Sequence, residues 1–273
     1  MLTRVEVVTP QGAVLDLPLG DISSSLQIES IEGLDPVKAT IASSSFAQLD
    51  GAQYQSSRRE TRDIKLRISF RPDYALTTVK ALRAELYRFF MPKSQVNLGF
   101  FSDDDSGVRI YGYVESFETS LFTKEPAVDI SVYCLDPDFY DPAPVVVDGM
   151  STASEDELTF VYDGNVETGF LLNFSAGRAV NEFNLYNRPE NGELQSLEFA
   201  SYLNMSDELE ISTIPGDKYA TRIDGTSRTS VLYGVSPQSV WLKLFPGINN
   251  IRLYEDGEPF GYTITYTNRY GGL

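Results

Sequence analysis

The sequence predicts a mainly β protein, and three observations support that fold class. Residues 63–70, 109–117 and 261–266 alternate between apolar and polar side chains with a period of two, which is typical of half-buried antiparallel strands. Turn dipeptides such as Asp-Gly and Asn-Gly recur between these runs. Aromatic residues make up 12% of the chain, a composition that favours strands. Many short strands separated by turns indicate β-sandwiches or barrels.

One segment, residues 76–91, departs from this pattern and predicts a helix. Its apolar side chains follow helical spacing: Leu76, Val79, Leu82, Leu86, Phe89 and Phe90. Asp73 can cap the start of this helix and Pro92 ends it. We expect the helix to cover one face of a sheet. The alternative, a helix lying on a membrane surface, is disfavoured because the rest of the chain is acidic.

A long polar segment, residues 45–62, is centred on the hairpin dipeptide Asp50-Gly51. It is too polar to form a core of its own, so it either remains in solvent or pairs with another subunit as an arm. The arginines at its base form either a solvated, ion-paired face or a subunit contact. The predicted subunit-interface candidates are Phe46, Leu49, Asp50, Gly51, Tyr54, Arg58, Arg59 and Arg62.

The chain of 273 residues is long enough for about two domains. Residues 136–144 contain three prolines and form a stiff, non-helical connection. We therefore predict one domain over residues 1–138, which includes the arm and the helix, and a second over residues 139–273. The sequence leaves open whether the last segment, residues 268–273, returns to the first domain. Residues 145–273 carry eight basic and eighteen acidic side chains, a net charge of −10.

The composition excludes most catalytic chemistry. The chain has no histidine, which removes histidine-based triads and nearly all zinc sites, and its one cysteine, Cys134, permits no internal disulfide. No nucleotide-binding or nucleophile-elbow motif occurs. Residues 103–107 superficially resemble a calcium loop but lack its ligand spacing, so a hairpin tip is expected there. The sequence predicts no enzyme, no cofactor and no metal site.

The net charge of −17 argues against a general nucleic-acid-binding surface. The N-terminus shows no apolar signal region, and no uncharged apolar run is long enough to span a bilayer. We expect synthesis in a cytoplasm and no membrane insertion.

Aromatic residues of the second half suggest two further interpretations. Trp241 precedes Leu242 and Leu244 in a predicted strand, and we expect it to be at least partly buried. Four tyrosines gather near the end of the chain: Tyr254, Tyr262, Tyr266 and Tyr270. They serve either core and interface packing or stacking against sugar rings.

Several segments together resemble the distal tail proteins of long-tailed siphophages, known as Dit. The resemblance spans nearly the whole chain and depends on the order and spacing of its motifs. The strongest is the run from Trp241 to Ile251, with a Trp-Leu-x-Leu-x-Pro-Gly-x-Asn pattern. The others are residues 28–36, Asp50-Gly51, residues 59–70, the helix, residues 134–140, residues 216–219 and residues 263–273.

This resemblance implies a structural virion protein that forms a hexameric ring at the tail tip, after synthesis in the host cytoplasm. The first domain would be a tail-tube-like β-sandwich with one helix, and the second a galectin-like β-sandwich. Implied partners are the tail tube protein, the tape measure protein, a tail-associated hub or lysin, a receptor-binding protein, and DNA in transit. The alternatives are a carbohydrate-binding adsorption module, the tail-tube protein itself, or a wall-degrading glycosidase with paired carboxylates.

Overall fold

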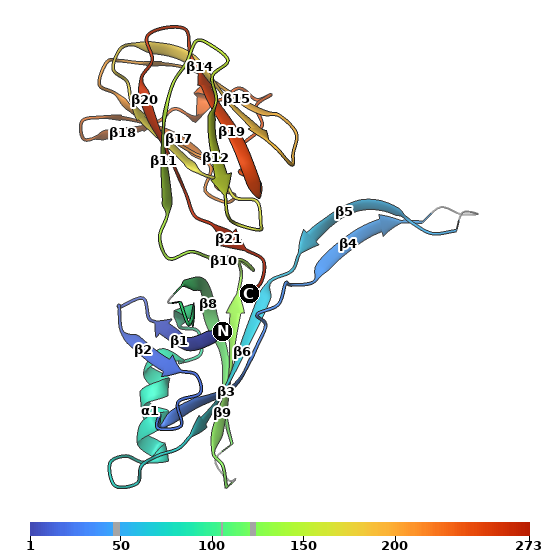
Figure 1. Cartoon of the computed structure of the whole chain (residues 1–273), viewed down its shortest axis with the longest axis vertical. Coiled ribbons are helices and arrows are strands. Elements are labelled where there is room, and N and C mark those ends of the chain that lie inside the picture. Colours follow the sequence, from blue (N-terminus) through green and yellow to red (C-terminus); the bar gives the residue numbers. More distant parts are fainter. Residues whose placement is uncertain (46–49, 105, 121–123) are drawn as a thin grey trace. The chain divides into compact units, whose positions relative to one another are not determined.

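The computed structural model describes residues 1–45, 50–104, 106–120 and 124–273, and its chain divides into two compact units (Figure 1). The first unit comprises Met1–Pro142 with Gly271–Leu273, and the second comprises Ala143–Tyr270. Strands dominate both units, as the sequence predicts. No helix among the described residues is long and apolar enough to span a membrane.

The first unit is built on an antiparallel sheet with the strand order β2-β1-β7-β8-β9-β6-β3. Its edge strands β2 and β3 contact each other, so the sheet curls back on itself and encloses a core. Buried side chains alternate with more exposed ones along β1 and β2, as at Val5 and Val7 of β1. The strands are β1 (Leu2–Val8), β2 (Val14–Pro18), β3 (Leu26–Glu32), β6 (Arg62–Phe70), β7 (Gln95–Ser102), β8 (Gly107–Ser120) and β9 (Ala127–Cys134).

The predicted helix is present as α1 (Val79–Phe89) and begins three residues later than expected. Thr78 is its N-cap, because the Thr78 hydroxyl accepts a hydrogen bond from the Ala81 N–H at 3.2 Å. Asp73 instead closes a turn before the helix by accepting from the Ala75 N–H at 3.0 Å. The apolar face of α1 buries Leu82, Leu86 and Phe89, so the helix covers the core as predicted.

The polar segment forms a hairpin of β4 (Ala39–Ser44) and β5 (Gln53–Arg59), which we call the hairpin arm. Figure 1 shows it as a two-stranded ribbon that leaves the sheet between β3 and β6. Within the described chain, its two strands pair only with each other. The arm begins at Ala39, earlier than the predicted residue 45, because the small and hydroxyl-bearing residues of β4 pair with β5. Phe46 and Leu49 lie outside the described residues.

The two units divide after Pro142, four residues beyond the predicted boundary. The intervening segment contains β10 (Phe139–Tyr140), which belongs to the first unit for two reasons. Phe139 is buried against Phe100, with ring centroids 5.8 Å apart, and Tyr140 pairs with Arg109 of β8. The last three residues, expected in the second domain, also belong to the first unit, so the second unit is an insertion into the first.

The second unit is a sandwich of two antiparallel sheets with the orders β11-β20-β13-β16-β17-β18 and β12-β19-β14-β15. Its core is rich in phenylalanine and leucine, including Phe174, Phe183 and Phe199. The strands are β11 (Val145–Met150), β12 (Leu158–Tyr162), β13 (Leu171–Ser175), β14 (Val180–Pro189), β15 (Gln195–Leu203), β16 (Glu208–Ser212), β17 (Tyr219–Asp224), β18 (Ser227–Ser230), β19 (Gly247–Tyr254) and β20 (Gly261–Tyr266), with a short 3₁₀ helix at Leu232–Gly234. The two-residue strand β21 (Arg269–Tyr270) follows β20 and belongs to neither of these two sheets.

Trp241 lies in an irregular segment rather than in a strand, and that part of the prediction is wrong. It is partly buried against the core, as expected, and Lys218 lies over its ring at 5.5 Å. Tyr262 and Tyr266 are 3% and 4% exposed, so they pack in the core and offer no surface for a sugar.

Candidate functional site at the base of the hairpin arm

The strands of the hairpin arm are exposed along nearly their whole length. Ile41 is 64% exposed and Tyr54 is 62% exposed, although both are large apolar side chains. The register places Ile41 opposite Ser57, and the Tyr54 hydroxyl lies 2.8 Å from the Ser57 hydroxyl, so these three share one face. That face has no cover within the described chain.

The predicted turn residues occupy the tip of the arm. Asp50 and Gly51 are exposed, and Gly51 has a φ of +94°, a left-handed conformation that glycine adopts without steric cost. Arg58 is exposed on β5, opposite Thr40. The side chains of Asp50, Tyr54 and Arg58 are therefore presented to solvent.

Arg59 and Arg62 behave differently from Arg58, because both are engaged within the first unit. Arg59 donates two hydrogen bonds to the Asp138 carboxylate, one of them from Nη2 to Oδ2 at 2.8 Å. Asp138 is only 2% exposed, and a buried carboxylate requires such a partner. The arm base is thus tied to the segment that leads out of the first unit.

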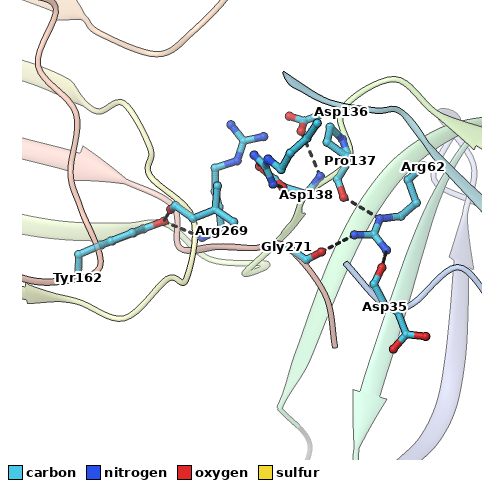
Figure 2. A network of polar contacts seen from close by, with 10 residues as sticks. Asp35, Arg62, Asp136, Pro137, Asp138, Tyr162, Arg269 and Gly271 are labelled. Atoms are coloured by element: carbon cyan, nitrogen blue, oxygen red, sulfur yellow. Dashed lines mark hydrogen bonds and ion pairs between the residues drawn. The ribbon is translucent and has the colours of Figure 1, made fainter. Parts of the chain in front are cut away.

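Arg62 is 1% exposed, and its guanidinium is surrounded by backbone carbonyl groups. Figure 2 shows it aimed at Asp35, Pro137 and Gly271, whose carbonyl oxygens accept at 2.7, 2.6 and 2.6 Å. The carbonyl of Gly33 accepts a further bond. We call Arg59, Arg62, Asp138 and these four carbonyl groups the anchor cluster. Arg62 is fully occupied within the chain, in contrast to the interface role expected for it.

The surroundings of Arg62 hold its guanidinium in place and shift its pKa. Its guanidinium carbon lies 4.4 Å from the centre of the Phe139 ring, a cation–π contact. Burial lowers the pKa of Arg62 from its ordinary value, and the nearby Cys134 and Asp138 oppose that shift. Burial also raises the pKa of the Cys134 thiol to about 12. Cys134 is therefore an inert, protonated side chain at neutral pH.

Gly33 is required at the start of the arm base. Its φ is +89°, and a Cβ added there would lie 2.1 Å from the Asp63 carbonyl oxygen. The last residues pack at the same place, because the Leu273 N–H donates to the Leu34 carbonyl at 3.0 Å. A Cβ on Gly272 would lie 2.8 Å from the Pro36 nitrogen. The anchor cluster therefore unites the arm base, the outgoing connection and the C-terminus.

Asp138 and Gly271 belong to the anchor cluster, although nothing in the sequence pointed to them. The proline-rich run marked the connection but not its buried carboxylate, and the partner of Arg59 lies 79 residues away in sequence. Gly271 is separated from Arg62 by 209 residues, and no local pattern links them.

A second feature of the first unit is an acidic groove of about 550 Å³ over β3, β6, β8 and β9. Five carboxylates and two cations line it, which leaves it net acidic: Glu32, Asp63, Glu115, Glu118 and Asp129, with Lys65 and Arg67. Arg67 joins Glu29 and Asp129, each at 2.9 Å. Among the described residues, no three or more cysteine, aspartate or glutamate side chains are placed so that they could hold one metal ion. The groove is therefore an acidic surface, and its lining shows no recognisable arrangement of catalytic residues.

The comparisons with known proteins concern both units. Residues 163–270 match the family model of the siphovirus-type tail component, C-terminal domain. The crystal structure of the phage SPP1 Dit protein, described as a hub of the adsorption apparatus in phages that infect Gram-positive bacteria, has a TM-score of 0.69 to this chain. That match covers 97% of this chain and 98% of the SPP1 chain at 15% identity, and it shows a shared fold.

Two further structural matches are weaker. Chains of the phage P2 baseplate in its activated conformation, with Ca and with Sr, have TM-scores of 0.49 and 0.48. Each match covers 97% of this chain and 98% of the baseplate chain at 9% identity. The search of curated proteins finds no match.

Proposed function

Because the chain belongs to the siphovirus Dit tail components, by its matched C-terminal domain and its shared fold, we propose that it forms a hexameric ring at the tail tip. The ring joins the tail tube to the receptor-binding or tail-associated components, and DNA passes through its centre. This is a structural role without catalysis. It is carried out in the virion, after synthesis in the host cytoplasm.

The observation that carries the proposal is the exposed hairpin arm on a fixed base. A two-stranded hairpin alone is at best marginally stable in water, and an uncovered apolar face adds to the cost. Ile41 and Tyr54 gain cover when the arm lies on a neighbouring subunit. The anchor cluster supports this role, because a fixed base reduces the entropy lost when the arm binds.

The acidic groove supports the proposed passage of DNA. A channel that carries DNA must not retain it, and carboxylates repel phosphate groups while cations attract them. We assign the outward face of β3, β6, β8 and β9 to the channel wall, since its two cations are already paired or surrounded by carboxylates.

Two of the alternatives lose support as the main role of the chain. A carbohydrate-binding module built on the four-tyrosine cluster is disfavoured, because Tyr262 and Tyr266 are buried in the core. A tail-tube protein requires only the first unit, whereas the family match lies in the second.

Native mass spectrometry of the whole chain tests the proposal, and a hexamer is the expected result. A variant with residues 40–58 replaced by a short Gly-Ser turn keeps the anchor cluster and should remain folded but monomeric. The double substitution Ile41→Ser with Tyr54→Ser should weaken the ring, whereas the matched control Tyr202→Ser with Met205→Ser, also at exposed positions, should not. A monomeric wild-type chain, or an intact ring without the arm, would contradict the proposal.

A further inference from the structure

The outward face of the sheet β12-β19-β14-β15 in the second unit carries an unusual arginine. Arg252 lies on β19 directly opposite Tyr186 of β14, and Tyr254 is two residues further along the same face. Its guanidinium carbon lies 4.8 Å from the centre of the Tyr186 ring and 6.0 Å from that of Tyr254. The intervening residues Ile251 and Leu253 are buried in the core, so Arg252 and both tyrosines face outward.

This guanidinium has no polar partner in the described chain. Other arginines of the second unit form ion pairs, such as Arg178 with Glu255 and Arg188 with Glu157. The side chain of Arg252 makes no ion pair or hydrogen bond to any described residue, and its Nε is buried without an acceptor. A unit with a net charge of −10 offers many carboxylates, yet Arg252 lies against two rings without one. Its Nε is buried, so the terminal nitrogens of the half-buried guanidinium are the donors left available to a ligand.

A polar hollow of about 240 Å³ lies beside the two tyrosines, at the end of β14 and β19. A register shift between Val180 and Glu182 marks a bulge in β14 at this point, a feature that redirects side chains. The polar wall of the hollow combines amides, carboxylates and the Tyr254 ring: Asn181, Glu182, Asn184, Tyr254, Glu255 and Asp256. The Tyr254 hydroxyl donates to Asp256 at 3.1 Å, and Arg178 holds Glu255.

The chemistry of this face selects the kind of ligand. The unit's net charge opposes an anion at long range, and Arg252 at the centre opposes a cation. A hydroxyl group is both donor and acceptor, so a neutral polyhydroxylated ligand satisfies Arg252 and the amides as well as the carboxylates. Tyrosine rings present a broad apolar surface with a polar tip, against which the C–H face of a sugar ring packs.

We propose that Arg252, Tyr186 and Tyr254, with the adjacent hollow, form a binding site for a neutral saccharide. Arg252 donates to sugar oxygens, the two tyrosines contact the ring face, and Asn184 and Glu182 bind further hydroxyl groups. The site uses none of the core tyrosines and does not depend on ring formation.

Saturation-transfer NMR on the full-length chain tests the site with four probes: D-galactose, D-glucose, N-acetyl-D-glucosamine and lactose. We expect transfer to at least one of them, with a Kd raised at least tenfold by Arg252→Met and by Tyr254→Ala. Arg252→Lys keeps the charge but loses the planar donor fork, and it should also weaken binding. The matched control Arg228→Met removes a paired arginine on β18 and should leave Kd unchanged.

Three results would overturn this inference. They are the absence of transfer to all four sugars, equal transfer in the wild type and in folded Arg252→Lys, and tighter binding of inorganic phosphate or of an acidic peptide at Arg252 than of any sugar. Circular dichroism identifies variants that fail to fold. Because all residues of the site come from one chain, sugar binding does not require the ring, and failure of this test is distinguishable from failure of the assembly proposal.

Discussion

Removing the guanidinium of Arg62 should destabilise the first unit strongly while leaving the second unit unchanged. The substitution Arg62→Met keeps an apolar stem of similar length but leaves the carbonyl oxygens of Gly33, Asp35, Pro137 and Gly271 without their donor. A hydrogen bond to a charged donor contributes about 1.5–3 kcal/mol to stability. The cost of removing the donor is smaller where water can hydrogen-bond to the carbonyl oxygen in its place. Because these four residues are not fully buried, we expect about 1 kcal/mol for each bond, or about 4 kcal/mol in all.

Differential scanning calorimetry measures the effect, and the two units allow an internal comparison. For a unit of this size a loss of about 4 kcal/mol lowers Tm by roughly 10 °C. Trp241, the single tryptophan, lies in the second unit, so its fluorescence reports that unit alone. In Arg62→Met, the calorimetric Tm of the first unit should fall, whereas the Tm of the second unit, followed by Trp241 fluorescence, should stay unchanged.

Arg67→Met is the matched control, because it removes an arginine of the same strand whose ion pairs with Glu29 and Asp129 are exposed to solvent. Exposed pairs contribute little, so its transition should stay close to that of the wild type. An Arg62→Met transition within a degree of the Arg67→Met transition would refute the claim that Arg62 fixes the arm base.

Three further predictions concern single positions. Gly33→Ala should lower the Tm of the first unit by several degrees, as measured by calorimetry, because its Cβ would collide with the Asp63 carbonyl oxygen; an unchanged Tm would refute this. Trp241→Ala should destabilise the second unit by about 2 kcal/mol in denaturant titration, since the side chain is only partly buried, and native wild-type emission should be blue-shifted from that of free indole. Cys134 should react with a thiol reagent at pH 8 only after unfolding. Because burial raises its folded-state pKa from 9.0 to about 12, the contribution of Cys134 to stability should be constant below pH 9 and should fall as pH rises from 9 towards 12. Rapid labelling of native protein would contradict the burial of Cys134.

The fold class was predictable because strand alternation and helical spacing are local patterns. Residues 63–70 and 109–117 alternate as expected, and α1 lies within the predicted segment. The exact start of α1 was not predictable, because Thr78 and Asp73 are both good capping residues and only the observed hydrogen bonds distinguish them. Boundaries of this kind depend on the tertiary packing of the preceding turn.

The anchor cluster was not predictable, because its contacts join residues far apart in sequence. An arginine at the base of a polar hairpin looks the same in sequence whether it is exposed, like Arg58, or buried, like Arg62. What separates them is the convergence of four carbonyl groups, which the backbone brings together only after folding. The return of Gly271 to the first unit likewise carries no local signal.

The claim that the hairpin arm lies on a neighbouring subunit is tested most directly by site-specific photo-crosslinking. A photoreactive phenylalanine analogue replaces Tyr54 in the arm, and in a separate protein it replaces the exposed Tyr202 of the second unit. At micromolar protein and physiological salt, the account predicts a ladder of covalent multimers from position 54 and almost none from position 202. Crosslinks from position 54 that stay within single chains, in a sample that native mass spectrometry shows to be assembled, would contradict it.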